Sequence, residues 1–460
     1  MIPLALLLAT FAAPATESGA AAIPAPDLHN GATVRREMAA YNPRYIFLMG
    51  PRMRALRDLE RQVLDRESHL QDVACSHRIV TEIRWLMGST VDIDRIDARL
   101  NDLRSSLQHP ELESKARERD PVDGSWGHCY TEWFFRLDGS YDGHFSNGEG
   151  GGNIPLLDRV NSPEKLTDYV KSISISDVAH NGVNHRREMN EALSTLIRLI
   201  MRDAPRGYPW HPQLKATLRD LLLNQLRNPR TGWWGERYVR SGGTEFVDDL
   251  SMTFHIVSYL HGDVPDLDKV ASTLLALKDL EYPIGWLEDR HYVNHHNMDV
   301  VVLFRYAWPF MNESQKREAS AQIARMLQWC LRESALPDGS FRRSTGGDDS
   351  VEEGEYFGVA FLARAGYFDP TRRFWTTDAF PGTEQLRRRL IDFIRKHKAT
   401  GAAGGAYYES ALSELEAPAN PWRLRHYGIS RSVGLRSKGA GQHEQKRRFS
   451  AHTEVCRNRG

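Results

Sequence analysis

The chain has 460 residues, of which 41% are hydrophobic, so it can form one large domain or two ordinary domains with a substantial core. Lys plus Arg and Asp plus Glu are both 60, so the net charge gives no sign of nucleic acid or an anionic membrane as a partner. The 11 Trp residues suit helix packing, but aromatic faces beside polar groups also suit interfaces and sugar sites.

Residues 1–25 are predicted to be a secretory signal peptide. Ile2 to Ala13 form an apolar run of the right length, and small residues with Ala-rich cleavage sites follow it up to Ala25. No Lys or Arg precedes the run, and the run is too short to span a membrane. We therefore expect an exported protein, secreted or periplasmic, with no membrane span.

The chain has four cysteines, which are widely separated and form no C-x-x-C pair, so they indicate neither a zinc site nor a redox motif. Export would allow one or two disulfides, and the sequence leaves their pairing open. The cysteines are Cys75, Cys129, Cys330 and Cys456.

From Arg35 to about Arg119, apolar residues recur at helical spacing and predict a helical scaffold. The segment 123–152 is dense in Gly and Asp, which predicts turns and exposed loops. Its glycines have no strand-then-helix context and no Lys-Ser/Thr ending, so they do not predict a phosphate-binding loop.

A repeated pattern occupies the middle of the chain. Glycines at 232, 285 and 339 lie about 53 residues apart, and each begins a loop that leads into an apolar helix. Further helices are predicted over 214–226, 267–280 and 314–331, and Asn184-His185 leads into another copy. Such units stack or close into a ring. We therefore predict an all-α fold over residues 26–410, an α/α toroid that is incomplete or resembles a six-hairpin barrel.

Residues 411–460 are predicted to be a separate tail. From Trp422 onward, basic residues, Gly and Ser outnumber apolar residues, and Asp and Glu almost vanish. Such a composition is typical of disordered segments and does not by itself indicate a nucleic-acid function.

The segment from Asn294 to Asp299 is the strongest candidate site. Five polar side chains gather at the start of an apolar helix, beside Trp286 and Tyr292. Helix capping explains one Asn and Asp299, but it does not explain the whole set. His291 and His295 are spaced to share a metal on a helix, yet no Glu stands between them as in the usual motif. We expect no metal and no cofactor.

These motifs resemble the helical-toroid polysaccharide lyases, the alginate lyases and the chondroitin/hyaluronan lyases. Those enzymes place a paired-Trp loop, an Asn or Asn-His segment at a helix start and a later Tyr around one cleft. This sequence has Trp233-Trp234, Asn294-His295, Asp338-Gly339-Ser340-Phe341 and Tyr356-Phe357-Gly358 in the same order, over residues 180–370. It departs from the chondroitin type at Arg342, because no His follows Phe341, and it has no room for their β domains.

The resemblance implies β-elimination on an acidic, uronate-containing polysaccharide or oligosaccharide. Donors near the uronate carboxylate would stabilise the developing charge, a base would take the neighbouring proton, and an acid would protonate the leaving oxygen. His295 or His296 is the expected base and Tyr356 the acid, with Trp rings holding sugars. The expected catalytic residues are Asn294, His295, His296, Tyr356, Arg237 and Arg342. The expected substrate-binding residues are Trp233, Trp234, Trp286, Tyr292, Asp249 and Asp299.

Three alternatives remain open. A glycoside hydrolase on a six-hairpin scaffold would use a carboxyl pair drawn from Asp248, Asp249, Asp299, Asp338 and Glu355. A non-catalytic glycan-binding or scaffolding protein would hold sugar without reacting. Gln225 followed by Gly232-Trp233-Trp234, and Pro337-Asp338-Gly339-Ser340-Phe341, also resemble the Gln-Trp repeats of terpene cyclases and prenyltransferases, although their Asp-rich motif is not evident.

Overall fold

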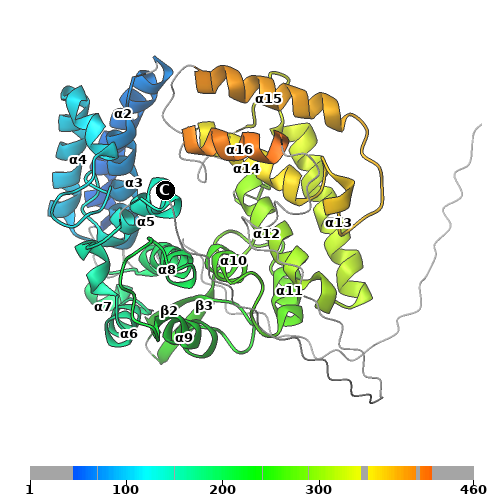
Figure 1. The fold of residues 1–460 in the computed structure, drawn as a ribbon, viewed down its shortest axis with the longest axis horizontal. Coiled ribbons are helices and arrows are strands. Elements are labelled where there is room, and N and C mark those ends of the chain that lie inside the picture. Colours follow the sequence, from blue (N-terminus) through cyan, green and yellow to red (C-terminus); the bar gives the residue numbers. More distant parts are fainter. Residues whose placement is uncertain are drawn as a thin grey trace, which may run out of the picture.

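The computed structural model describes residues 45–69, 71–149, 151–240, 242–288, 290–342, 351–399 and 405–416. Most of this chain is helical, which confirms the predicted all-α class (Figure 1). The predicted signal peptide, Cys456 and most of the predicted tail lie outside the described residues. Helix α16 (Gly405–Glu416) continues past the tail boundary that the sequence predicted at residue 410.

Three N-terminal helices pack against one another at one end of the molecule (Figure 1). Helix α4 begins at a true cap, because the Asp92 side chain accepts a hydrogen bond of 3.0 Å from the Arg95 amide. A disulfide between Cys75 and Cys129 joins the start of α3 to the loop before α5. The three helices are α2 (Tyr45–Ser68), α3 (Ala74–Ser89) and α4 (Ile93–Gln108).

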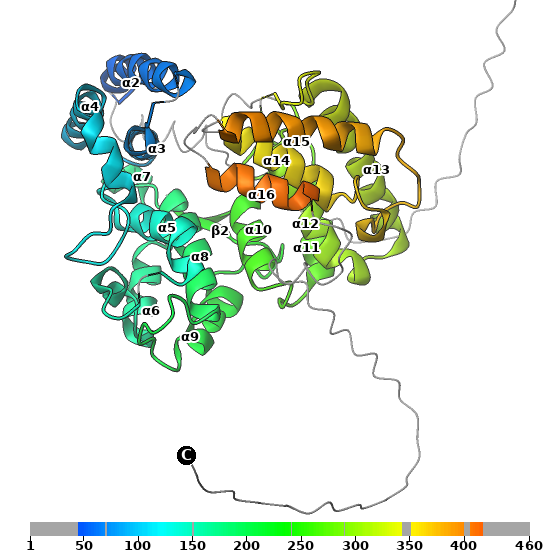
Figure 2. The ribbon, with the colours of Figure 1, turned by 45° about the horizontal axis from the view of Figure 1, so that its top comes forward.

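Six helices form a row in which each contacts the next, and Figures 1 and 2 show that the row curves. In order they are α5 (Trp133–Gly143), α8 (Arg186–Met201), α10 (Leu250–Tyr259), α12 (Asn294–Ala307), α14 (Val351–Arg364) and α16. Almost every residue of α12 is buried. A helix that is buried on all sides belongs to the interior of a large core, which explains its apolar sequence.

A second set of helices flanks this row. Helix α9 contacts α6 and α8, α11 contacts α12 and α13, and α15 contacts α16. The flanking helices are α6 (Pro163–Ser172), α9 (Leu214–Asp220), α11 (Leu267–Ala276), α13 (Glu313–Trp329) and α15 (Thr383–Ala399). Row and flanking helices alternate along the chain from α8 to α16, which is the predicted order of helix, loop and helix.

The three glycine loops each close with an isolated bridge, which is antiparallel in the first and third loops and parallel in the second. The residue two positions after each glycine forms an isolated bridge to a residue before it, in the pairs Arg227–Trp234, Glu281–Leu287 and Ala335–Phe341. A Cβ atom at Gly285 would lie 2.1 Å from the Leu280 carbonyl oxygen, so no side chain fits there. Gly339 has a φ of 95°, a backbone conformation that residues with a Cβ atom rarely adopt, so the backbone itself favours glycine there.

Short helical segments connect these elements. Two π-helical segments end α9 and α13 at equivalent places, just before the loops that lead to α10 and α14. The short segments are α7 (Val178–Asn181), the π segments Leu221–Gln225 and Cys330–Ser334, and the 3-10 segments Pro110–Arg117, Phe145–Asn147, Pro155–Arg159, Trp308–Phe310 and Pro370–Arg372.

Two parts of the fold differ from the prediction. The polar segment after Trp234 is a hairpin of β2 (Gly235–Arg240) and β3 (Gly243–Asp248), and β1 (Ile175–Ser176) pairs parallel to β2. Residues 133–143, predicted as part of a loop region, form helix α5. Leu137 and Ser140 in that helix are fully buried, so tertiary packing overrides the turn preference of its Gly and Asp residues.

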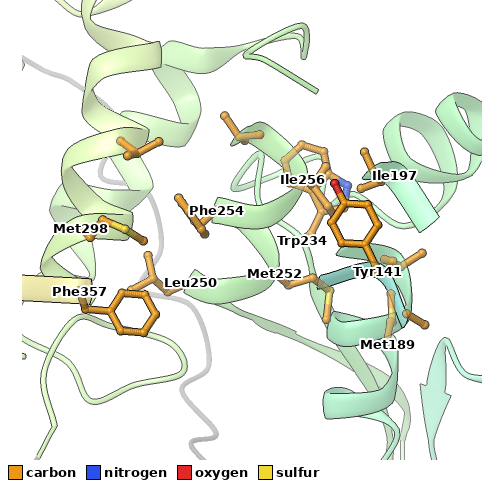
Figure 3. Close-up of a cluster of buried hydrophobic side chains, with 14 of the residues drawn as sticks. Tyr141, Met189, Ile197, Trp234, Leu250, Met252, Phe254, Ile256, Met298 and Phe357 are labelled. Atoms are coloured by element: carbon orange, nitrogen blue, oxygen red, sulfur yellow. The ribbon is translucent and has the colours of Figure 1, made fainter. Parts of the chain in front are cut away.

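The core runs between the helices of the row. Figure 3 shows Met189 and Ile197 of α8, Met252, Phe254 and Ile256 of α10, Met298 of α12 and Phe357 of α14 around one cluster of buried side chains. Within the described residues, no helix is both long enough and apolar enough to cross a membrane.

Candidate functional site

A buried polar cluster lies where α8, α10 and α12 begin. Arg186, the first residue of α8, donates from Nε to the Asp249 carboxylate and from Nη2 to the Tyr282 hydroxyl at 3.2 Å. Asp249 also caps α10, because its other oxygen accepts from the Met252 amide at 2.8 Å. Burial alone would lower the pKa of Arg186, but the Asp249 charge and the Tyr282 hydroxyl outweigh burial and raise it. Arg186 is therefore a permanent cation.

His296 belongs to the same cluster. Its ring stacks on Tyr282 with centroids 4.2 Å apart, and its Nδ1 lies 3.1 Å from the Trp286 carbonyl oxygen. A carbonyl can only accept, so Nδ1 carries the hydrogen. Burial, and next the electrostatic interaction with His295, lower the pKa of His296 to about 3. His296 is therefore a neutral imidazole near pH 7.

Asp299 is fully buried on α12, and neither of its oxygens has a hydrogen-bond partner among the described residues. Burial, followed by the charge of Asp249, raises the pKa of Asp299 well above its ordinary value. Asn297 is equally buried, and both of its amide atoms also lack partners in the described part of the chain. Unpaired buried groups of this kind are costly and gather at functional positions.

Asn294 starts α12, as the sequence predicted, and connects to the downstream loop. Its Nδ2 donates to the Ser334 hydroxyl at 2.9 Å, and the Arg342 amide donates to the Ser334 carbonyl at 2.7 Å. Arg342 is exposed. Two of the expected charge-stabilising residues, Asn294 and Arg342, thus lie on either side of Ser334.

His295 and Tyr356 meet through a shared neighbour. The half-buried His295 ring stacks on Phe357 with centroids 3.8 Å apart, and Tyr356 packs on Phe357 edge-on at 5.1 Å. Tyr356 also packs on Tyr407 of α16 at 5.6 Å. The expected base and the expected acid, which lie 61 residues apart in the sequence, therefore both contact Phe357.

Residues that the sequence did not single out extend this arrangement. His255 of α10 stacks parallel to Tyr259 at 5.4 Å, and Arg198 of α8 lies 5.1 Å over the Tyr259 ring. An electrostatic interaction with His295 contributes to the lowered pKa of His255. The contacts form two groups, one on α8 and α10 and one on α12, α14 and α16, and the electrostatic interaction between His255 and His295 links them. We name the two groups together the histidine–tyrosine cluster. Its members are Arg198, His255, Tyr259, His295, Tyr356, Phe357 and Tyr407.

A second buried carboxyl group lies near Arg186. Glu236 of β2 is 1% exposed and accepts a hydrogen bond from the Ser176 hydroxyl at 3.0 Å. Burial raises the pKa of Glu236 well above its ordinary value, although Ser176 and Arg186 oppose the rise. The next inward residue of the strand, Tyr238, donates its hydroxyl to Asn184 at 3.2 Å. The hairpin thus closes the buried polar cluster at the start of α8.

The structure places several expected site residues elsewhere. Trp233, Trp234 and Trp286 are fully buried, so they have no exposed face on which a sugar could rest. The indoles of Trp233 and Trp234 donate to the carbonyls of Val270 at 3.1 Å and Leu222 at 2.7 Å, which ties their loop to two flanking segments.

Arg237 and Tyr292 contact other parts of the fold. Arg237 donates to the Gln225 carbonyl at 2.9 Å and lies over Phe246, on the opposite face of β2 from Glu236. Tyr292 packs edge-on against Trp329, at the end of the flanking helix α13.

Three of the five carboxyl groups of the hydrolase alternative hold loops in place. Asp248 accepts from Thr231 at 2.9 Å and Asn228 at 3.1 Å, and burial raises its pKa to about 6. Glu355 accepts from the Phe341 amide at 2.6 Å. Asp338 is exposed and bonds to Ser340 of its own turn. Each contact is explained by local structure.

His255 could have been found from the sequence. Ser251, His255 and Tyr259 are spaced by four within an otherwise apolar helix, so they share one face. Arg186 and Tyr282 carry no such pattern, because their partners lie far away in the sequence.

Among the described residues, no group of three or more His, Cys, Asp or Glu side chains is arranged to hold a metal ion. Comparison of the chain with protein families, curated proteins and solved structures gives no match. The proposal below therefore depends on the geometry of the two clusters.

Proposed function

We propose that this chain is a carbohydrate-active enzyme that cleaves an acidic, uronate-containing polysaccharide by β-elimination, and that its helical row is part of an incomplete α/α toroid. The observation that supports this proposal is the histidine–tyrosine cluster. It combines an imidazole, phenols and a guanidinium on neighbouring helices, with Asn294 beside them. Elimination next to a carboxylate needs this combination of groups.

In the proposed reaction, His295 takes the proton from the carbon next to the uronate carboxylate. The electron pair of that C–H bond forms a carbon–carbon double bond, and the bond to the glycosidic oxygen breaks. Tyr356 donates a proton to the leaving oxygen. The Asn294 amide and the Arg342 guanidinium hydrogen-bond to the carboxylate while negative charge develops on it. His296 is less suitable as the base, because its pKa of about 3 lies far below neutral pH.

In this proposal, sugar rings rest on tyrosines instead of the buried tryptophans. Tyr259, Tyr356 and Tyr407 keep part of their rings accessible, and Tyr407 is 38% exposed. An aromatic ring beside hydrogen-bonding groups suits the apolar face and the hydroxyls of a sugar. Arg198 supplies positive charge for an acidic polymer, and it also pairs with Asp138 at 2.8 Å.

We also propose that the protein is exported to a secreted or periplasmic location. The Cys75–Cys129 disulfide supports this, because disulfides persist mainly in oxidising compartments. The apolar segment Ile2 to Ala13 remains the expected export signal.

The test is ultraviolet absorbance in the band of a conjugated unsaturated uronate, measured with alginate, hyaluronan, chondroitin and polygalacturonate as substrates. Wild type is expected to raise the absorbance on one of them, and His295→Ala and Tyr356→Phe are each expected to lose it. Tyr292→Phe is the matched control, because Tyr292 packs on the flanking helix and its variant should keep wild-type activity.

New reducing ends without unsaturated product would overturn elimination and favour hydrolysis. Binding of a polymer without any cleavage would favour a glycan-binding protein. Circular dichroism of each variant would show that lost activity does not come from lost folding.

A further inference from the structure

A chain of hydrogen bonds connects His255 to Arg186. The Nδ1 atom of His255 lies 3.1 Å from Asn190 Oδ1, and Asn190 Nδ2 donates to the Ser251 hydroxyl at 3.3 Å. Ser251 interacts with the Tyr282 hydroxyl, which accepts from Arg186 at 3.2 Å. The network joins α8, α10 and the loop before α12. It therefore links the histidine–tyrosine cluster to the buried polar cluster.

The direction of these bonds determines which nitrogen of His255 carries the hydrogen. The amide oxygen of Asn190 is an acceptor, so the His255 nitrogen that faces it must be the donor. Nδ1 is therefore protonated, and Nε2 of the neutral ring keeps its lone pair. Nε2 has no hydrogen-bond partner among the described residues. A hydrogen-bond acceptor is thus available beside Tyr259.

The surroundings keep His255 neutral. Burial first, and then the electrostatic interactions with Arg198 and His295, lower the pKa of His255 to about 3. A neutral ring with an open Nε2 accepts hydrogen bonds at any ordinary pH. It is a weak base, so it is better suited to hold a hydroxyl group than to remove a carbon-bound proton.

We propose that His255 binds substrate by accepting a hydrogen bond from a sugar hydroxyl at Nε2, and that Asn190 positions it by holding the proton on Nδ1. This inference rests on the proposed function, because it identifies a group that recognises the sugar. His255 is then a specificity residue: it favours a sugar with a hydroxyl donor at that position over a deoxy or O-acylated sugar. Sites that hydrogen-bond a substrate hydroxyl discriminate strongly against analogues that lack it.

The first experiment determines which ring nitrogen of His255 carries the hydrogen. Full-length protein labelled with ¹⁵N-histidine is examined by long-range ¹H–¹⁵N correlation, which distinguishes protonated from unprotonated ring nitrogens. The His255 signals are assigned as those missing from His255→Phe. We expect a protonated Nδ1 and an unprotonated Nε2 in wild type and in Asn190→Asp, whose carboxylate can also accept from Nδ1. In Asn190→Leu, which removes the acceptor, we expect the hydrogen to move to Nε2.

The second experiment measures binding of hexasaccharides prepared from alginate, hyaluronan and polygalacturonate. His255→Phe keeps an aromatic ring against Tyr259 but removes Nε2, and it should weaken binding about tenfold, as for one lost hydrogen bond. Asn190→Leu should weaken binding similarly, whereas Asn190→Asp should bind within about twofold of wild type. His211→Phe, which changes an exposed histidine near α9, should bind like wild type.

The outcomes separate this inference from the proposed function. A protonated Nε2 in wild type overturns the inference, whatever the activity. Wild-type binding by His255→Phe also overturns it, even if unsaturated product is formed. If none of the three hexasaccharides binds, the proposed function and the substrate role of His255 fall together, and the spectrum still decides the role of Asn190. Equal binding by Asn190→Leu and wild type removes the positioning role.

Discussion

Arg186 and Asp249 form an ion pair between the first residue of helix α8 and the cap of helix α10. The Asp249 side chain is 2% exposed and that of Arg186 is 23% exposed, so the carboxylate depends on the guanidinium for compensation. Removing one partner of a buried pair leaves a buried charge, which costs more than the pair contributes.

We therefore expect Arg186→Met to lower the free energy of unfolding by about 3 kcal/mol, measured by urea denaturation at pH 7. The double variant Arg186→Met/Asp249→Asn should recover most of this loss, because Asn is neutral and still caps a helix. An unchanged urea midpoint in Arg186→Met would show that the pair does not support the junction of α8 and α10.

The buried carboxyl group of Asp299 should make stability depend on pH. Its pKa is higher in the folded protein than in the unfolded chain, because burial and the Asp249 charge disfavour the ionised form. As pH rises above the ordinary carboxyl pKa of about 4, the unfolded chain loses its proton first and the folded state is destabilised.

Asp299→Asn removes this titration. We expect the variant and wild type to be similarly stable at pH 4, and the variant to be more stable at pH 7 by more than about 1 kcal/mol. Thermal unfolding across this pH range gives the comparison. A parallel pH dependence in the two proteins would mean that Asp299 does not titrate between these values.

The disulfide between Cys75 and Cys129 closes a loop over a sequence separation of 54 residues. Cys75→Ala/Cys129→Ala should lower the free energy of unfolding by about 2–4 kcal/mol, because the unfolded chain regains freedom. When wild type is denatured in the presence of a reductant, its free energy of unfolding should approach that of the variant.

Cys330 should not react with a thiol reagent in the native protein, because it is fully buried and burial raises its pKa. Labelling of native Cys75 would contradict the disulfide.

Two aromatic residues should respond in opposite ways. Trp234→Phe leaves the Leu222 carbonyl without its donor inside the core, and it should cost about 1–3 kcal/mol of stability while KM for the polymer stays unchanged.

Tyr407→Ala should change stability by less than about 0.5 kcal/mol. It should raise KM about fivefold, as expected for ~1 kcal/mol of lost ring contact. If Trp234→Phe raised KM and kept wild-type stability, Trp234 would be a sugar-binding residue, as the sequence predicted.

The sequence alone predicted the helical class, the alternation of loop and helix, and the start of α12 at Asn294. It did so because helical periodicity and glycine positions are local signals. It also predicted His295 as a site residue, from the polar residues at the start of an apolar helix, and Tyr356, from the resemblance to the lyases; both roles stay predictions. The prediction of a loop after Trp234 was wrong. The side chains of Glu236, Arg237 and Tyr238 alternate between the two faces of β2, and this alternation can be recognised only once β3 is paired with β2.

Tertiary structure alone decided which side chains face one another. The tryptophans of the Gly-Trp motifs could serve either the core or a sugar site, and burial places all three in the core. Arg186 and Asp249 are hydrogen-bonded although they lie 63 residues apart in the sequence, and no local pattern predicts this pair. The tautomer of His255 likewise depends on Asn190 of another helix. Pairing between distant residues is fixed by helix packing, whereas most of the helices are fixed by local periodicity. The sequence therefore determined most of the helices, and the tertiary structure determined which side chains meet.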